Sequence, residues 1–331
     1  MPQSLSPRRS WKLIVEALWG TSAARKRHAR YTSRQHTVEA ALGVIRTRWP
    51  ELRSTETCEP IFVLAAGWRS GSTFLQRLIM SGEEAFLWGE PYRHAAVVDS
   101  LASQVKAFTD VWPMDKYFVD GHCQGAALSS TWIANVYPPR ADFLAAHVAY
   151  FERLFAQPVQ ASRGGRWGVK EIGLTVDHAC YLRWLFPKAR FLFLYRNPYD
   201  AYRSYRRWRN WYRTWPNEPV FTAGSFGRFW SELTGDFIAN HQKVDGLLVR
   251  YEELRSAETR KQIEAYLGMP LADPVSLPHV DGLRDADRRR HSQSVPRFEW
   301  FLLRRRVEPL ASRLGYIGAA EADPTDRTVL S

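Results

Sequence analysis

The sequence predicts an α/β protein of three layers, in which a central parallel sheet lies between helices. The first observation is a short, fully apolar run at residues 61–66, which is bounded by glycine and is typical of a buried parallel strand. The second is the amphipathic helix that follows it, with Leu75, Leu78 and Ile79 on one face. The third is that further apolar runs, at residues 190–195 and 247–250, are again followed by helical patterns.

The remaining elements follow in order along the chain. We expect a strand that begins at residue 85 and ends at the carboxylate of Glu90, and another at residues 166–170 that ends in Lys170. Residues 110–140 read as an irregular insert that includes Trp112 and Tyr117. Helical patterns cover residues 92–109, 141–157 and 176–186, a stretch onward from 199, a stretch around 229–237, the residues from Glu252 to Gly268, and 298–314.

Length and charge set the domain organisation and the class of partner. The 331 residues, 45% of them hydrophobic, can bury one large core with appendages. Residues 1–55 are expected to form a basic helical N-terminal extension, and residues 56–331 the main domain with a C-terminal helix. The formal charge of +12 indicates an anionic partner, such as a nucleotide, a nucleic acid, an acidic glycan or a lipid surface.

The cysteines and the apolar segments bear on location. Cys58, Cys123 and Cys180 are widely spaced and odd in number, which supports neither a disulfide framework nor a zinc pattern and favours a reducing compartment. The apolar run near the N-terminus is interrupted by charge, and no segment approaches 18 uninterrupted apolar residues. We therefore expect a cytoplasmic protein without a membrane span, for which contact with a membrane surface stays open.

The loop after the first strand has the composition of an anion site. Gly67 and Gly71 let the backbone turn with its N–H groups inward, and the hydroxyls of Ser70, Ser72 and Thr73 stand at the helix start. When the nucleotide-triphosphate pattern is aligned on Thr73, Ser72 falls where that pattern requires lysine. Arg69 instead supplies a positive fork within the loop.

A second anion site is predicted at the end of the strand over residues 190–195. This strand is followed by Arg196, where the Walker B strand of a kinase or ATPase would end in an aspartate that holds magnesium. Pro198 favours a helix start immediately afterwards, and Ser204 lies eight residues after Arg196. From the strand tip and from two turns along the helix, Arg196 and Ser204 can approach one anion from opposite sides.

Three of these patterns, taken in order, resemble the PAPS-dependent sulfotransferases, where PAPS is 3′-phosphoadenosine 5′-phosphosulfate. The R-S-G-S-T stretch from Arg69 to Thr73 is similar to their 5′-phosphosulfate loop. The R-N-P-x-D-x-x-x-S stretch from Arg196 to Ser204 is similar to their 3′-phosphate site. The strand before Tyr251 and the following Y-E-E-L run resemble a third feature, in which the tyrosine lies beside adenine. The resemblance covers residues 61 to about 268 and implies the P-loop NTPase-like sulfotransferase fold.

The resemblance also implies roles for individual residues. A lysine at a comparable strand end lies near the bridging oxygen in the family, and Lys170 matches it, with Arg69 as the second cation of transfer. Glu90 matches the catalytic base of sulfotransferases that act on sugars and on protein tyrosine; the alternative is a structural role, in which Glu90 pairs with Arg93 or caps a turn. The cytosolic members use histidine as the base, so His94 and His122 remain candidates.

Other positions of the donor site are less determined. Phe74 occupies the place where cytosolic members have a tryptophan that stacks on adenine, and Trp68 is a further candidate; for both, the alternative is a core position. The cytosolic members carry an R-K-G sequence in the C-terminal part, which this chain lacks. One of Arg288, Arg289 and Arg290 could complete the 3′-phosphate site there, and the alternative is that all three form a solvated charge run in a loop.

The function that follows is sulfuryl transfer from PAPS to a hydroxyl of a carbohydrate, a glycolipid or a small natural product, in line and without a metal. A P-loop nucleotide kinase is the first alternative. The second is a nucleic-acid-binding protein, because arginine and aromatic residues alternate over residues 199–213. The expected site contains no metal, and the expected partners include no nucleic acid. No motif identifies the acceptor or the oligomeric state.

Overall fold

The computed structural model describes residues 33–90, 96–119, 136–162, 164–207, 220–273 and 295–316, together with the single residues 11, 15, 21, 22, 26 and 29. These divide into two compact units, Met1–Arg53 with Leu101–Leu144 and Ser54–Ser100 with Ala145–Ser331. The two units are described separately below. The expected division of the chain near residue 55 stays a prediction.

The larger unit is built on a five-stranded parallel sheet with the order β2-β3-β1-β4-β5. β1 lies at its centre and is buried along its whole length, because β3 and β4 flank it and helices cover both faces. This arrangement confirms the predicted α/β class. The strands are β1 Ile61–Ala65, β2 Ala85–Gly89, β3 Arg166–Ile172, β4 Arg190–Tyr195 and β5 Leu247–Arg250.

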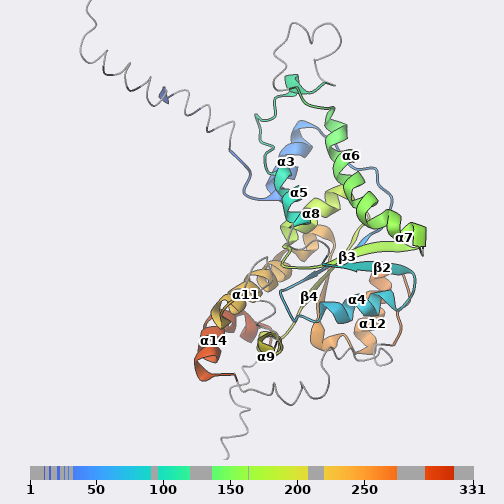
Figure 1. The fold of residues 1–331 in the computed structure, drawn as a ribbon, viewed down its shortest axis with the longest axis vertical. Helices are drawn as coiled ribbons and strands as arrows, with labels where there is room; N and C mark the ends of the chain where they lie inside the picture. Colours follow the sequence, from blue (N-terminus) through green and yellow to red (C-terminus); the bar gives the residue numbers. More distant parts are fainter. Residues whose placement is uncertain are drawn as a thin grey trace, which may run out of the picture. The chain divides into compact units, whose positions relative to one another are not determined.

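The crossover connections place the helices of this unit on opposite faces of the sheet. The chain passes from β1 to β2 in one direction and from β3 to β4 in the other, so right-handed crossovers put α4 and α8 on different faces. In Figure 1, α12 lies on the side of α4, and α14 runs beside α11. The helices are α4 Ser72–Met80, α8 Val176–Leu185, α9 Pro198–Arg207, α11 Ala223–Asn240, α12 Ala257–Leu267 and α14 Arg297–Arg313.

Aromatic rings hold the three central strands in register. Phe62 of β1 stacks on Phe191 of β4 at 5.5 Å and meets Trp167 of β3 edge-on at 5.8 Å. All three rings are almost fully buried. Such contacts add to the burial energy by about 0.5–1.5 kcal/mol each. Because all strand pairs are parallel and in this register, the carboxyl ends of the strands lie at one edge of the sheet, where the loops that carry the candidate site begin.

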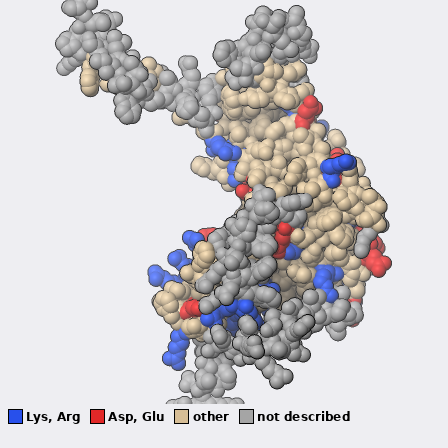
Figure 2. Space-filling view, viewed as in Figure 1, with Lys and Arg blue, Asp and Glu red and all other residues tan. Residues whose placement is uncertain are grey.

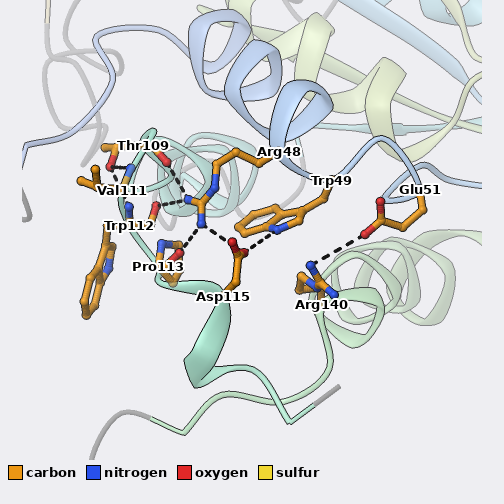
Figure 3. Close-up of polar contacts among 9 residues, drawn as sticks. All are labelled: Arg48, Trp49, Glu51, Thr109, Val111, Trp112, Pro113, Asp115 and Arg140. Atoms are coloured by element: carbon orange, nitrogen blue, oxygen red, sulfur yellow. Dashed lines mark hydrogen bonds and ion pairs between the residues drawn. The ribbon is translucent and has the colours of Figure 1, made fainter. Parts of the chain in front are cut away.

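The smaller unit contains α3 Val38–Arg48, with the insert packed around the end of that helix. Figure 3 shows the guanidinium of Arg48 at the centre, where it donates to the carbonyl oxygens of Thr109 and Trp112. The same guanidinium bonds Asp115, which also accepts from the indole of Trp49 at 2.7 Å. The insert is thus irregular but well bonded. Its one short helical turn, among the described residues, is η2 Asp115–Tyr117.

Three further helical segments precede β3 in the chain, and two element boundaries differ from the predicted ones. The segments are α5 Val97–Val105, α6 Arg140–Phe151, and α7 Gln157–Ser162, which follows a π-helical turn at Glu152–Ala156. The helix expected over residues 141–157 therefore continues to residue 162, and of the helix expected over residues 92–109 the structure shows 97–105, with 91–95 outside the described residues.

The helix start expected at Glu252 was wrong. Tyr251–Glu253 form a 3₁₀ turn, and α12 begins at Ala257 because the Ser256 hydroxyl caps it by accepting from the Thr259 amide at 3.0 Å.

Among the described helices, none combines the length and the apolar composition that a bilayer crossing requires.

Candidate active site

The loop between β1 and α4 has the backbone conformation of an anion cradle. Gly67, Arg69 and Gly71 have positive φ values of 84°, 61° and 91°. The first amides of α4 have no helical carbonyl to bond, so they are available to an anion. Ser70 is 1% exposed, and its hydroxyl has no hydrogen-bond partner among the described residues. A buried hydroxyl in this position fits a phosphate oxygen that it could donate to.

The two predicted anion sites lie directly against each other. The Nε of Arg69 donates to the hydroxyl of Ser204 in α9 at 2.8 Å. The Nη1 of Arg196 donates to the carbonyl oxygen of Arg69 at 3.0 Å. Residues that are 127 and 135 positions apart in the chain are therefore in direct contact. One ligand with two anionic groups a few ångströms apart can contact both sites.

Tyr251 fills the space between the loop and Arg196. A Cβ atom on Gly71 would lie 2.0 Å from the ring of Tyr251, so only glycine fits there. The guanidinium of Arg196 lies 4.2 Å from the centre of the same ring. The structure thus places Tyr251 in the wall of the cradle. Its predicted place beside adenine stays a prediction.

The backbone at Arg196 is bonded on both sides by residues that the sequence analysis did not assign to the site. Its carbonyl oxygen accepts from the indole of Trp230 in α11 at 2.8 Å. The next amide, of Asn197, donates to the carboxylate of Glu252 at 2.8 Å. Glu252 also accepts from the hydroxyl of Tyr316 at 3.0 Å. Glu252 lies within the Y-E-E-L run and could have been found there, whereas no local pattern marks Trp230 or Tyr316.

Glu90 and Lys170 form an ion pair at the ends of β2 and β3. Register places Gly89 opposite Lys170, and the amide of Glu90 donates to the carbonyl oxygen of Lys170 at 2.8 Å. Their side chains are hydrogen-bonded to each other, and Lys170 is only 4% exposed. Glu90 has a φ of 35°, an unfavourable backbone conformation for a residue with a side chain. Arg93, the other partner considered for Glu90, lies outside the described residues.

The remaining candidates of the loop helix separate into a core residue and three others. Trp68 is 4% exposed and stacks on Phe229 at 5.5 Å, so it is a core residue. Phe74 is half-buried, and the guanidinium of Arg255 lies 5.4 Å from its ring. Ser72 is buried at the start of α4, and Thr73 beside it is exposed.

Several of the predicted candidates cannot be placed. His94, His122 and the three arginines Arg288, Arg289 and Arg290 lie outside the described residues. Of the described histidines other than His36, His147 bonds Tyr181, His178 bonds Thr175 and Asp99, and His241 bonds the carbonyl of Phe237 in α11. Those three have structural partners. Within the described ranges, no group of three or more His, Cys, Asp or Glu side chains is arranged to hold a metal ion.

The described part of α9 does not offer the stacking surface of a nucleic-acid site. Its aromatic residues Tyr199, Tyr202 and Tyr205 are at most 4% exposed. Basic side chains are nevertheless abundant in this part of the larger unit, as Figure 2 shows around α11 and α14. The exposed arginines of α14 are Arg297, Arg304, Arg305, Arg306 and Arg313.

Comparison with known proteins gives a family and several related structures. Curated protein sequences include no match to this chain. A sulfotransferase domain from the curacin biosynthetic pathway is 15% identical, with a TM-score of 0.45, and the match covers 80% of this chain and 99% of that one. A sulfotransferase domain from the Synechococcus PCC 7002 olefin synthase is 18% identical, with a TM-score of 0.41 and coverage of 78% and 97%. Sulfotransferase STF9 from Mycobacterium avium is 18% identical, with a TM-score of 0.37 and coverage of 89% and 85%.

The family assignment rests on the sequence itself. The model of the sulfotransferase family matches residues 60–273, which is more than half of the chain. This span begins just before β1 and ends after α12, so it contains the loop, the Glu90–Lys170 pair, Arg196, Ser204 and Tyr251. The protein therefore belongs to the sulfotransferase family and is a PAPS-dependent sulfotransferase.

Proposed function

We propose that the cradle formed by the loop, Arg196 and Ser204 binds PAPS, and that the enzyme transfers its sulfuryl group to a hydroxyl of a carbohydrate, a glycolipid or a small natural product. The observation that carries the proposal is the direct contact of Arg69 with both Ser204 and Arg196. This contact supports the binding of one ligand by both sites, because Arg69 of the loop adjoins both residues of the second site. The unpartnered Ser70 hydroxyl and the close fit of Tyr251 on Gly71 support the same ligand.

In the proposed complex the chain supplies position and charge. The loop amides and the Ser70 hydroxyl bind the 5′ end of the donor, and Arg196 and Ser204 bind its 3′-phosphate. Phe74 and Tyr251 border the adenine. Lys170 and Arg69 neutralise the negative charge that collects on the bridging oxygen as its bond to sulfur breaks. Because these cations have that role, the proposed step uses no metal ion.

Glu90 is the proposed general base. It accepts the proton of the acceptor hydroxyl as that oxygen forms its bond to sulfur, in line with the departing oxygen. The ion pair with Lys170 supports this role, because it places a proton acceptor and a buried cation at the same strand edge. The class of acceptor is inferred from the many aromatic and basic residues of the chain and from the resemblance of the stretch around Glu90 to that of sulfotransferases acting on sugars and on protein tyrosine.

Ligand binding tests the donor. We expect adenosine 3′,5′-bisphosphate to raise the Tm. At a concentration 100 times its Kd, it should raise the free energy of unfolding by about 2.7 kcal/mol. ATP with magnesium and a single-stranded oligonucleotide serve as the competing ligands in the same assay. Stabilisation by ATP with magnesium alone would support a kinase, and stabilisation by the oligonucleotide alone a nucleic-acid-binding protein.

Turnover of the Glu90→Gln variant tests the base. Glutamine keeps an oxygen for Lys170 but cannot take up the proton, so we expect a loss of about 10²- to 10⁴-fold in kcat, with unchanged affinity for adenosine 3′,5′-bisphosphate. Transfer from ³⁵S-labelled donor to a panel of sugar and small-molecule acceptors is the measurement. The matched control is Glu84→Gln, an exposed carboxylate just before β2. Wild-type turnover in the Glu90 variant would assign the base to another residue.

A further inference from the structure

The helix α14 contacts both ends of the segment that contributes Arg196 and Ser204. These two residues lie in one stretch of chain, but Arg196 follows a strand and Ser204 lies within α9. Arg196 and Ser204 can bind one anion together only if the end of β4 and α9 keep a fixed distance and orientation. Hydrogen bonds from the side of α14 meet this segment at both places.

At the strand end, the contact runs through Glu252. Its carboxylate accepts from the Asn197 amide at 2.8 Å and from the hydroxyl of Tyr316 at 3.0 Å, and Tyr316 lies just after α14. The Nε of Arg250 donates to the same hydroxyl at 3.0 Å. Burial, together with the charge of Glu252, raises the pKa of Tyr316, so this hydroxyl keeps its proton at neutral pH.

Along α9, the contacts come from two carboxylates of α14. Glu308 accepts from the hydroxyl of Tyr199 at 2.6 Å. Glu299 accepts from the hydroxyl of Tyr202 at 2.7 Å and pairs with Arg206 at 2.6 Å. These bonds lie before and after Ser204 in α9. They therefore fix the position of Ser204 along the helix axis and the rotation of α9 about that axis. Tyr199 and Tyr202 are nearly fully buried, and hydrogen bonds to carboxylates in such places are strong.

We propose that α14 and Tyr316 are positioning elements for the 3′-phosphate, which set Arg196 and Ser204 at the spacing that one phosphate group requires. The inference rests on the proposed donor site. None of the α14 residues needs to touch the nucleotide. They lower the entropic cost of binding, because Arg196 and Ser204 lose less conformational entropy on binding the anion when they are already held in place.

Two single hydroxyl deletions make the test. Tyr316→Phe removes the hydroxyl that donates to Glu252 and accepts from Arg250, and Tyr199→Phe removes the donor to Glu308. The matched control is Tyr266→Phe, whose hydroxyl accepts from the Phe191 amide and donates to the Asp245 carbonyl, both at 2.9 Å. Phe191 lies at the opposite end of β4 from Arg196, so the control loses similar bonds away from the site.

Calorimetric binding of two nucleotides to each variant is the measurement. Adenosine 3′,5′-bisphosphate has the 3′-phosphate, and adenosine 5′-monophosphate lacks it. We expect Tyr316→Phe and Tyr199→Phe to bind the bisphosphate about tenfold more weakly, the scale of one hydrogen bond to a charged group, with little change for the monophosphate. The KM for PAPS should rise by a similar factor while kcat is retained.

Three outcomes would overturn the inference. Equal weakening of both nucleotides would show a general loss of structure, and equal weakening in Tyr266→Phe would show a nonspecific one. Unchanged bisphosphate binding in both Tyr316→Phe and Tyr199→Phe would show that α14 and Tyr316 have no positioning role. Failure of the proposed donor site looks different, because the wild-type enzyme itself would then bind no bisphosphate, and the inference would fall with it.

Discussion

Gly71 shows how one missing side chain shapes the cradle. Its φ of 91° lies in the left-handed region, and a Cβ atom there would meet the ring of Tyr251 at 2.0 Å. Two separate costs therefore oppose any substitution. The backbone cost is about 1–2 kcal/mol for a residue with a Cβ. The steric cost comes in addition, because Tyr251 would have to leave its place under Arg196.

The Gly71→Ala variant separates these two costs when it is compared with Gly268→Ala. Gly268 also has a positive φ, 68°, but open space surrounds its Cβ position. We expect Gly268→Ala to lower stability by about 1 kcal/mol and to leave nucleotide binding intact. Gly71→Ala should lower stability further and abolish binding of adenosine 3′,5′-bisphosphate. Thermal unfolding measures the loss of stability, and calorimetry measures the affinity for the bisphosphate. Equal losses of both in the two variants would show that Tyr251 is not part of the nucleotide site.

Single residues also show where local patterns suffice. The composition of the loop predicted an anion site, since glycine, serine and arginine each have a chemical reason to be there. The pairing of Glu90 with Lys170 could not be predicted, because it depends on the register between β2 and β3, 80 residues apart in the chain. Trp68 was ambiguous for a similar reason. Only its stacking on Phe229 identifies it as a core residue.

Among the elements, the insert of the smaller unit depends on a single arginine. Arg48 donates to the carbonyl oxygens of Thr109 and Trp112 and to the carboxylate of Asp115, and it lies 4.2 Å above the ring of Trp49 (Figure 3). Lysine can bond one or two of these groups but has no planar fork to bridge them. The other hydrogen bonds of residues 109–117 join neighbouring parts of the insert, whereas those of Arg48 join the insert to α3.

We therefore expect Arg48→Lys to increase hydrogen exchange selectively over residues 109–117. The control is Arg46→Lys in the same helix, since Arg46 bonds only the carbonyl of Leu42 in its own helix among the described contacts. Hydrogen exchange followed by mass spectrometry measures the change for each peptide. Equal protection of residues 109–117 in the two variants would contradict the assigned role of Arg48.

The helix α9 illustrates how an element's pattern can indicate two functions. Interleaved arginines and aromatics are typical of single-stranded nucleic-acid binding. In the fold, Tyr199, Tyr202 and Tyr205 face inward, and Arg206 is paired with Glu299. The pattern therefore reflects an amphipathic helix with a buried aromatic face, over the residues that the structure describes. Which face is buried depends on α11 and α14, which come later in the chain.

For the whole molecule, stability should depend on pH through the buried His147. This ring bonds the hydroxyl of Tyr181 at 2.6 Å, and burial lowers the pKa of His147 to about 4 from 6.5. Between pH 6.5 and 4 the unfolded chain therefore takes up a proton that the folded protein does not. The contribution of the neutral His147 ring to the free energy of unfolding is complete above pH 6.5 and is lost progressively as the pH falls toward 4.

His147→Gln should flatten this part of the profile, since glutamine does not titrate. The measurement is the urea midpoint of unfolding from pH 4 to pH 8. His241→Gln is the control, because His241 is a half-buried histidine of the same unit whose ring bonds the carbonyl of Phe237 in α11. We expect the control to keep the wild-type slope. The same slope in His147→Gln would show that other groups cause the acid sensitivity.

The sequence by itself determined the α/β class, the strands, the anion loop and the order of the two phosphate-type motifs. These follow from local chemistry: apolar runs must be buried, glycine permits positive φ, and arginine with serine favours an anion. Only the tertiary structure decided that Arg69 bonds Ser204 and Arg196, that Glu90 pairs with Lys170, and that Tyr251 lies on Gly71. The physical reason is that these contacts join the ends of different strands, and their distances depend on register and helix packing across the whole sheet.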